Sequence, residues 1–206
     1  IQNKALELSL FLTLPASAAL LIASEEIISA LFGYGSFDQE SAINSGKALY
    51  YFALGLPAFS LIKVFSSFFF ANHDTKIPFY ISLFSVLTNI VISISYFNEI
   101  GFIIIPIATT ISSWLNAILL FAFLKNRDLF SFNNIFLVRF VKIIIASLLM
   151  AIFFNFLITY FKYELAFNQN IKSFYLILSV ILSLLFYLLV SYWIKAFKTS
   201  DIKLKY

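Results

Sequence analysis

One lysine of this sequence lies inside an apolar stretch, where a charge needs a physical reason. Lys63 falls within Ala48–Ala71, about seven residues, or roughly 10 Å of helix, from the nearer end. Ser60 and Ser67 share its helical face. A charge at that depth in a bilayer costs about 2.5–3.5 kcal/mol. Either the ammonium extends to the interface along its stem, or it faces a cavity and binds an anionic lipid headgroup. The two hydroxyls favour the cavity.

Hydroxyl and amide side chains line one face of several other apolar stretches. Their spacing of three to four residues is typical of one helical face. Such residues let membrane helices pack closely, which is one interpretation. The other is a shared water-filled cavity, which Asn89 and Asn116 favour because a buried amide needs several partners. The stripes are Ser9, Thr13 and Ser17; Ser82, Ser85, Asn89, Ser93 and Tyr96; and Thr109, Ser112, Ser113 and Asn116.

The residue types that catalysis and metal binding require are scarce. The chain has no cysteine, which excludes disulfides and thiolate metal sites, and only one histidine, His73. Glu25–Glu26 is the only candidate acid pair and fits a solvated helix end better. Without a nucleotide loop, a metal-ligand cluster or a nucleophile beside a base, we expect no cofactor and no enzyme. The basic residues are dispersed between apolar stretches, so we expect no nucleic-acid partner.

The elements that position these side chains are long apolar helices. The chain is 62% hydrophobic and 12% charged, against about 25% charged in an ordinary soluble domain. A helix crosses a bilayer with about 20 mostly apolar residues, whereas barrel strands are shorter and alternate. The sequence therefore predicts an all-α polytopic transmembrane bundle of about six helices. These are expected at Ala5–Phe32, Ala48–Ala71, Pro78–Phe97, Phe102–Leu124, Phe136–Phe161 and Ser173–Phe197.

The distribution of Lys and Arg predicts the orientation, because cytoplasmic loops carry an excess of both. Ten of these residues fall on the side that holds both chain ends and three on the other, with Lys63 inside a span. Both ends are therefore predicted to be cytoplasmic. The ten are Lys4, Lys76, Lys125, Arg127, Arg139, Lys142, Lys195, Lys198, Lys203 and Lys205, and the three are Lys47, Lys162 and Lys172.

The longest polar break suggests a division of the chain. We predict four transmembrane helices in residues 1–124, a cytoplasmic link at 125–135, and a final helix pair with a short cytoplasmic tail at 136–206. The chain begins with Ile1 and no signal-peptide pattern follows it. We expect it to be a fragment of a longer protein.

Four segments together resemble a known family. Leu31–Asp38 looks like a periplasmic turn, Ala53–Val64 like the helix that follows it, Phe69–Pro78 like the turn "FYARxDTxTP", and Trp114–Ala117 like an "LNA" element. Their order and spacing are similar to those of the MurJ (MviN) lipid II flippase family, within the multidrug/oligosaccharidyl-lipid/polysaccharide exporter superfamily. The likeness covers about residues 5–124, and the last two spans match only in position and hydrophobicity. Asn72 stands where the turn motif has arginine.

The resemblance implies a transporter of fourteen transmembrane helices, of which this chain would supply the last six. It implies translocation of an undecaprenyl-linked peptidoglycan precursor across the bacterial cytoplasmic (inner) membrane, through a cationic cavity between two lobes. The implied partners are that precursor, membrane lipids and the N-terminal remainder of the same chain, which would carry the essential cavity arginines. The last helix pair would form a groove for the lipid tail. The residues expected on this chain's wall of the cavity are Lys63, Ser60, Ser67, Asn89 and Asn116.

Three other functions are compatible with the sequence. A flippase or exporter for another polysaccharide-lipid or a drug, in the same superfamily, is the nearest. A membrane-embedded enzyme acting on a lipid would need an acid and a base near one interface, where only Glu25 and Glu26 lie. A structural scaffold would tolerate Lys63→Leu without loss of function.

Overall fold

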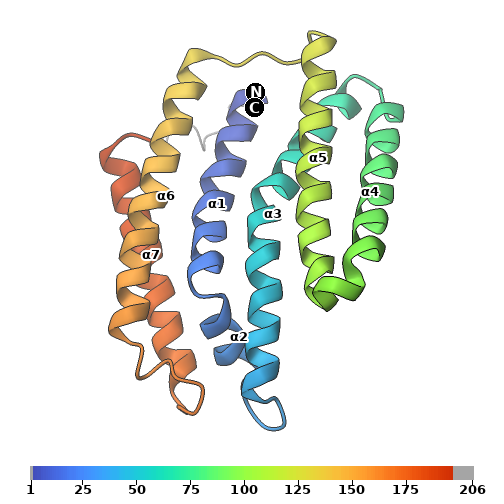
Figure 1. Cartoon of the computed structure of the whole chain (residues 1–206). Coiled ribbons are helices and arrows are strands. Elements are labelled where there is room, and N and C mark those ends of the chain that lie inside the picture. Colours follow the sequence, from blue (N-terminus) through green and yellow to red (C-terminus); the bar gives the residue numbers. More distant parts are fainter. Residues whose placement is uncertain (1, 197–206) are drawn as a thin grey trace.

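The computed structural model describes residues 2–196, and within this range the chain is helical with no strand (Figure 1). This confirms the predicted all-α class. The helices are α1 Gln2–Ile22, α2 Ser24–Phe32, α3 Gln39–Ala71, α4 Lys76–Ile100, α5 Ile104–Asn126, α6 Asn134–Tyr160 and α7 Lys172–Trp193, with a short 3-10 helix at Gly101–Ile103.

Five helical stretches in the described range are long and apolar enough to cross a membrane. One of them, Lys76–Asn126, has 51 residues and folds back on itself at Gly101, whose φ is 73°, to give the hairpin of α4 and α5. The six predicted stretches thus correspond to α1 with α2, and to α3 through α7. The predicted end at Phe197 lies outside the described residues, and α7 ends at Trp193.

The first predicted span is divided in the structure. We expected one helix from Ala5 to Phe32, but α1 ends at Ile22 and the short helix α2 begins at Ser24. Ala23 between them has φ −121° and ψ 33°, outside the helical region. Glu25 and Glu26 lie in the first turn of α2, where negative charge is favourable to a helix.

Helix α3 is central in the bundle. It packs against α1, α2 and α5, while α4 packs on the outer side of α5, and α6 joins α1 to α7 (Figure 1). Gln2, the turn at 72–75 and the link at 127–133 lie at one end, which we call the amino-terminal end. The turns at 33–38 and 161–171 lie at the opposite end, which we call the α2 end.

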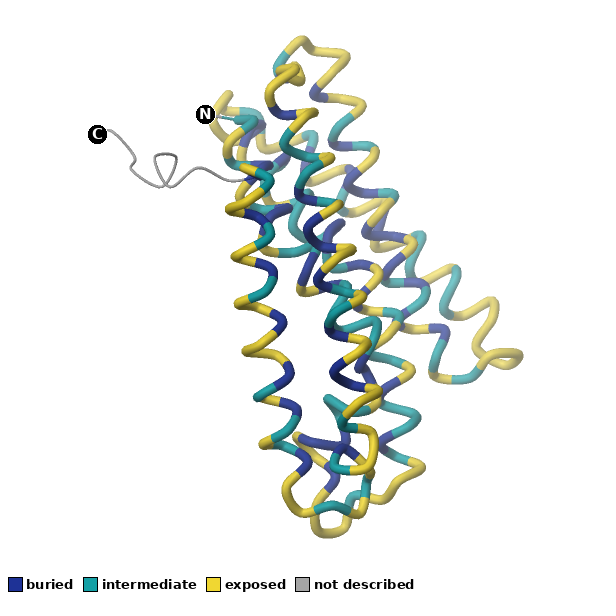
Figure 2. Tube along the Cα trace, turned by 90° about the vertical axis from the view of Figure 1, so that its left-hand side faces the viewer, coloured by how far each residue is buried: buried dark blue, intermediate teal, exposed yellow. Residues whose placement is uncertain are grey.

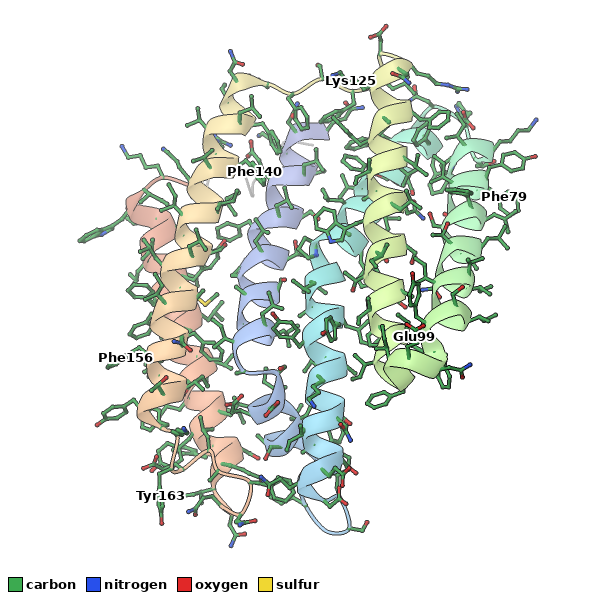
Figure 3. The ribbon with its side chains drawn as sticks, viewed as in Figure 1. Phe79, Glu99, Lys125, Phe140, Phe156 and Tyr163 are labelled. Atoms are coloured by element: carbon green, nitrogen blue, oxygen red, sulfur yellow. The ribbon has the colours of Figure 1, made fainter. Side chains whose placement is uncertain are left out.

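The outer surface is apolar, as a lipid-facing surface should be. Buried and exposed positions alternate along the helices (Figure 2), so each helix turns one face inward. Phe79 and Phe156 point away from the bundle in Figure 3 and are mostly exposed. In water such a surface would aggregate, whereas in a bilayer it faces a solvent of its own polarity.

Two clusters of buried apolar side chains hold the bundle together, and α1 contributes to both. Phe11 packs with Met150 and Phe154 in the cluster that joins α1 to α6 and α7. Leu6 packs with Phe65 in the cluster that joins α1 to α3 and α5. Since both clusters use α1, the last helix pair is attached to the first four predicted spans chiefly through this helix.

Pro15 offers no backbone N–H to the carbonyl four residues earlier in α1, and a distant helix donates to that carbonyl instead. Proline has no N–H, so the Phe11 carbonyl four residues earlier lacks its intrahelical donor. The Tyr187 hydroxyl on α7 donates to this oxygen at 2.7 Å, and its ring packs against Phe11 with centroids 5.0 Å apart.

Pro57 has the same effect in α3. It leaves the Ala53 carbonyl without a donor, and Ser17 Oγ of α1 donates to that oxygen at 2.6 Å. Two neighbouring carbonyls of this kinked segment also accept bonds from another helix. Thr110 Oγ1 of α5 donates to the Tyr51 carbonyl at 2.6 Å, and Trp114 Nε1 donates to that of Leu54 at 3.0 Å. Helices α1 and α5 are therefore pinned to the kink of α3.

Candidate substrate-facing site

The three predicted residues of α3 divide between packing and an open surface. Ser60 is half-buried and its hydroxyl contacts that of Ser9 on α1, so it belongs to a helix contact. Lys63 and Ser67 are exposed on the surface of α3. Ser67 Oγ donates to the Val64 carbonyl at 2.7 Å, within its own helix. Lys63 lies eight residues before Ala71, or about 12 Å along the helix axis from the end of α3.

The two predicted asparagines lie between α4 and α5. Asn89 is half-buried, and its Nδ2 donates to Thr109 Oγ1 at 3.1 Å and to Ser112 Oγ at 3.4 Å. Asn116 is buried, and its Nδ2 donates to Ser82 Oγ at 3.5 Å. Both amides thus turn toward the neighbouring helix. They form a group separate from that of Lys63.

One acceptor in this second group has no partner in the described part of the chain. Asn116 Oδ1 is buried without a hydrogen bond. An unpaired buried acceptor is costly, so it marks a place where a further donor from water or another chain segment would fit. The α4–α5 hairpin therefore offers hydroxyl and amide groups but, in its buried face, no charge.

A largely buried ion pair, which was not predicted from the sequence, lies at the amino-terminal end. Arg139 Nη1 of α6 is 2.8 Å from Glu7 Oε2 of α1, with side chains 17% and 8% exposed. We had counted Arg139 on the side predicted to be cytoplasmic and given Glu7 no role. The usable signal was an acidic residue inside the first apolar stretch. Breaking a buried pair of this kind costs about 3–5 kcal/mol.

The turn between α3 and α4, which lies in the motif segment Phe69–Pro78, holds helix ends together. Asp74 Oδ1 accepts hydrogen bonds from the backbone N–H groups of Lys76 and Ile77 at 3.1 and 3.2 Å, which caps the start of α4. Its Oδ2 is 2.7 Å from Arg127 Nη1, which follows α5. His73 adopts a φ of 58° in the same turn. This geometry fixes the α3–α4 turn against the end of α5.

An apolar crevice opens between the helices of the bundle. It has a volume of about 460 Å³ and is walled by α1, α3, α5, α6 and the link, with no charged or hydroxyl-bearing residue in its lining. Its walls include Leu10, Phe65, Phe121 and Phe136. A second apolar hollow of about 240 Å³ lies between α1, α6 and α7. Both have the chemistry to hold a hydrocarbon chain and neither can hold a headgroup.

The comparison with known proteins decides the family. A family model described as "Lipid II flippase MurJ" matches residues 1–176. The chain belongs to the MurJ family. A MurJ relative from Rhizobium meliloti, described as "Probable lipid II flippase MurJ", is 41% identical over 151 residues, which are 73% of this chain and 28% of the relative. The Thermosipho africanus "Lipid II flippase MurJ" is 28% identical over 189 residues, covering 92% of this chain and 36% of that one.

A solved MurJ structure has the same arrangement of helices. The structure titled "Lipid II flippase MurJ, inward closed conformation" aligns with 92% of this chain and 37% of its own, at a TM-score of 0.75 and 27% identity. The chain therefore spans about a third of the length of the MurJ proteins that it matches. The MurJ match extends to residue 176, beyond the range of about 5–124 in which we recognised motifs.

Proposed function

We propose that this chain is the C-terminal part of a lipid II flippase that translocates undecaprenyl-linked peptidoglycan precursor across the bacterial cytoplasmic membrane. The observation that carries this proposal is membership of the MurJ family over residues 1–176. The protein would act as a transporter rather than an enzyme. Its partners would be the lipid-linked precursor, the membrane lipids and the N-terminal remainder of the same chain.

The proposed topology follows from charge and from the two ends of the bundle. Residues 1–124 would form transmembrane helices of the C-terminal lobe, 125–135 a cytoplasmic link, and 136–206 the last helix pair and tail. The amino-terminal end of the bundle would face the cytoplasm. Lys76, Lys125 and Arg127 lie near this end, in agreement with the excess of basic residues expected on that side.

Lys63 and Ser67 would form part of the wall that meets the headgroup. A diphosphate cannot cross hydrocarbon unaided, so a transport path for it needs polar and cationic groups. An exposed ammonium on α3 is such a group, and a lysine acts on phosphate as a point charge without a fixed fork geometry. Ser60 meets Ser9 of α1, and Asn89 and Asn116 lie between α4 and α5, so these three would support the wall through helix packing rather than line it beside Lys63. The crevice along α6 has the apolar lining that an isoprenoid tail requires.

The test is complementation of a flippase-depleted bacterium by the full-length protein carrying Lys63→Gln. If the ammonium holds the headgroup, growth falls while the amount of protein in the membrane, followed by immunoblot, stays normal. Lys63→Arg should retain part of the activity because it keeps the charge. The matched control is Lys47→Gln, which removes an exposed lysine from the same helix and should be silent. Full growth with Lys63→Gln would reject the role of Lys63.

The substrate is tested separately. The full-length protein in liposomes should move fluorescent lipid II between leaflets faster than protein-free liposomes do. Movement of an undecaprenyl-linked glycan without the peptide, but not of lipid II, would reassign the substrate within the same superfamily.

A further inference from the structure

The α2 end of the bundle contains a buried lysine that the proposed transport does not use. Lys172, the first residue of α7, is 1% exposed. Its Nζ donates to the carbonyl of Gly33 at 2.7 Å and to that of Phe167 at 2.6 Å. The same atom lies 4.6 Å from the centroid of the Tyr34 ring and 4.4 Å from that of Phe167. Within residues 2–196 it forms no ion pair, so carbonyls and aromatic faces stabilise this charge.

The neighbouring serine adds two hydrogen bonds at the same place. Ser173 Oγ donates to the Ala30 carbonyl at 2.5 Å, and the Tyr34 hydroxyl bonds Ser173 Oγ at 2.7 Å. The carbonyls of Ala30 and Gly33 lie at the C-terminal end of α2, where a helix leaves its last carbonyls unbonded and its dipole favours a cation. The first two residues of α7 therefore cap α2.

The backbone around Lys172 is fitted to it closely. A Cβ added at Gly33 would lie 2.9 Å from Lys172 Nζ, 2.8 Å from the Phe167 ring and 2.5 Å from the Ser29 carbonyl. Only glycine allows the turn after α2 to approach the ammonium this closely. The cage is thus built from α2, the following turn, the α6–α7 turn and α7 together.

We propose that Lys172 is a positioning residue, a joint that fixes the α6–α7 helix pair to the α2–α3 turn so that these elements move as one unit during transport. That these elements move during transport rests on the proposed flippase function, whereas the contacts of Lys172 are a property of this chain. Apolar helix contacts can slide by small steps as the side chains repack. A buried ammonium cannot, because a displacement of about 1 Å breaks both of its bonds and leaves a charge among apolar groups.

Two further contacts along α6 and α7 agree with a rigid attachment. At the amino-terminal end the Glu7–Arg139 pair ties α6 to α1. Midway, the Tyr187 hydroxyl ties α7 to the Phe11 carbonyl of α1, four residues before Pro15. The helix pair is therefore held at three levels, each by a polar group in an apolar environment, and Lys172 is the one that holds the α2 end.

The test measures distance, because stability alone would not separate a joint from ordinary packing. The chain has no cysteine, so single cysteines at Ser36 and Tyr163, both exposed at the α2 end, can carry spin labels in the full-length protein if its remaining cysteines are replaced (Figure 3). We expect one narrow distance distribution, the same with and without added lipid II. Lys172→Met keeps most of the stem but removes the charge, and should lose the narrow distribution. Lys162→Met, an exposed lysine of the α6–α7 turn, is the matched control and should keep it.

Each outcome decides the proposal. A narrow, unchanged distribution in Lys172→Met would overturn it, and so would a wild-type distribution that shifts when lipid II is added. If Lys172→Met does not accumulate, Tyr34→Ala removes one ring and the bond to Ser173 while leaving the lysine, and should broaden the distribution. The distances do not depend on transport, so a wild-type protein that fails to move lipid II would contradict the proposed function and leave the joint to be judged by the labels.

Discussion

Tyr187→Phe tests whether a distant hydroxyl compensates for the proline in α1. The side chain is 2% exposed, and its hydroxyl donates at 2.7 Å to the Phe11 carbonyl. Phenylalanine keeps the ring contact and removes the hydroxyl, which donates to this carbonyl and also lies beside the hydroxyls of Ser147 and Ser191. An unsatisfied buried acceptor costs about 1–3 kcal/mol, and measured bonds between membrane helices average about 0.6 and reach about 1.7. We expect a loss of about 1–2 kcal/mol of unfolding free energy.

A double-mutant cycle with Pro15→Ala isolates the bond between the Tyr187 hydroxyl and the Phe11 carbonyl. Alanine restores a backbone N–H that can bond the Phe11 carbonyl, so the hydroxyl becomes dispensable. In the Pro15→Ala background, Tyr187→Phe should cost less than about 0.5 kcal/mol, giving a coupling energy of roughly 1 kcal/mol. Tyr192→Phe, the same change at an exposed position of α7, is the control and should be within about 0.5 kcal/mol of wild type.

The assay is reversible unfolding of the full-length protein in mixed micelles by added dodecyl sulfate, followed by circular dichroism. Equal costs of Tyr187→Phe in the wild-type and Pro15→Ala backgrounds would refute the reasoning. They would mean that the hydroxyl contributes through something other than the carbonyl that proline leaves free.

Three further results are expected. Glu26 lies in α2, outside the membrane-length stretches, and burial, then its neighbour Glu25, raises its pKa above the usual 4.5 against the lowering effect of a backbone hydrogen bond. The ionised carboxylate is therefore disfavoured in the fold, so Glu26→Gln should raise Tm at neutral pH. The gain should shrink as the pH falls through the raised pKa toward about 4.5 and should be absent below it, and a gain independent of pH would contradict this. Gly46→Ala would place a Cβ 2.7 Å from Glu25 Cγ and 2.9 Å from its Cα, so α2 must shift from α3 at a cost of about 1–3 kcal/mol, and an unchanged Tm would show that α2 yields freely. Single cysteines at Ser36 and Thr75 should react with an impermeant thiol reagent from outside intact cells at Ser36 only, and the opposite pattern would reverse the proposed orientation.

The helices were predictable because apolar length is a local property. The predicted end of the second stretch at Ala71 is the end of α3, and the end of the third at Phe97 is three residues short of that of α4. The start of α3 was placed at Ala48, nine residues late, since its first turns are polar. Asp38 accepts a hydrogen bond from the backbone N–H of Ser41 and starts the helix there. An apolar-length criterion does not detect the polar first turns of a helix.

The arrangement of the candidate site was less predictable, because shared spacing does not fix which neighbour a face meets. Ser60 and Lys63 lie three residues apart, yet one contacts α1 and the other is exposed. Many of the hydroxyls donate to the carbonyl four residues earlier in their own helix, as Ser85 and Thr109 do. These hydroxyls therefore have a hydrogen-bond partner without a neighbouring helix or a water-filled cavity. The surroundings of Lys172 could not be predicted, because its partner Gly33 is 139 positions away in the sequence and no local pattern links the two.

The ion pair of Glu7 and Arg139 has a consequence for how the protein is made. Its two residues are separated by 132 positions. At a synthesis rate of about 5–20 residues per second, α1 leaves the ribosome roughly 7–26 s before its arginine exists. During that interval Glu7 lacks this partner, and because it lies near the amino-terminal end of α1 its carboxylate can stay hydrated at the proposed cytoplasmic face instead of entering the bilayer centre at a cost of about 2.5–3.5 kcal/mol. Helix α1 is therefore expected to reach its final place in the bundle only when α6 arrives and Arg139 pairs with Glu7.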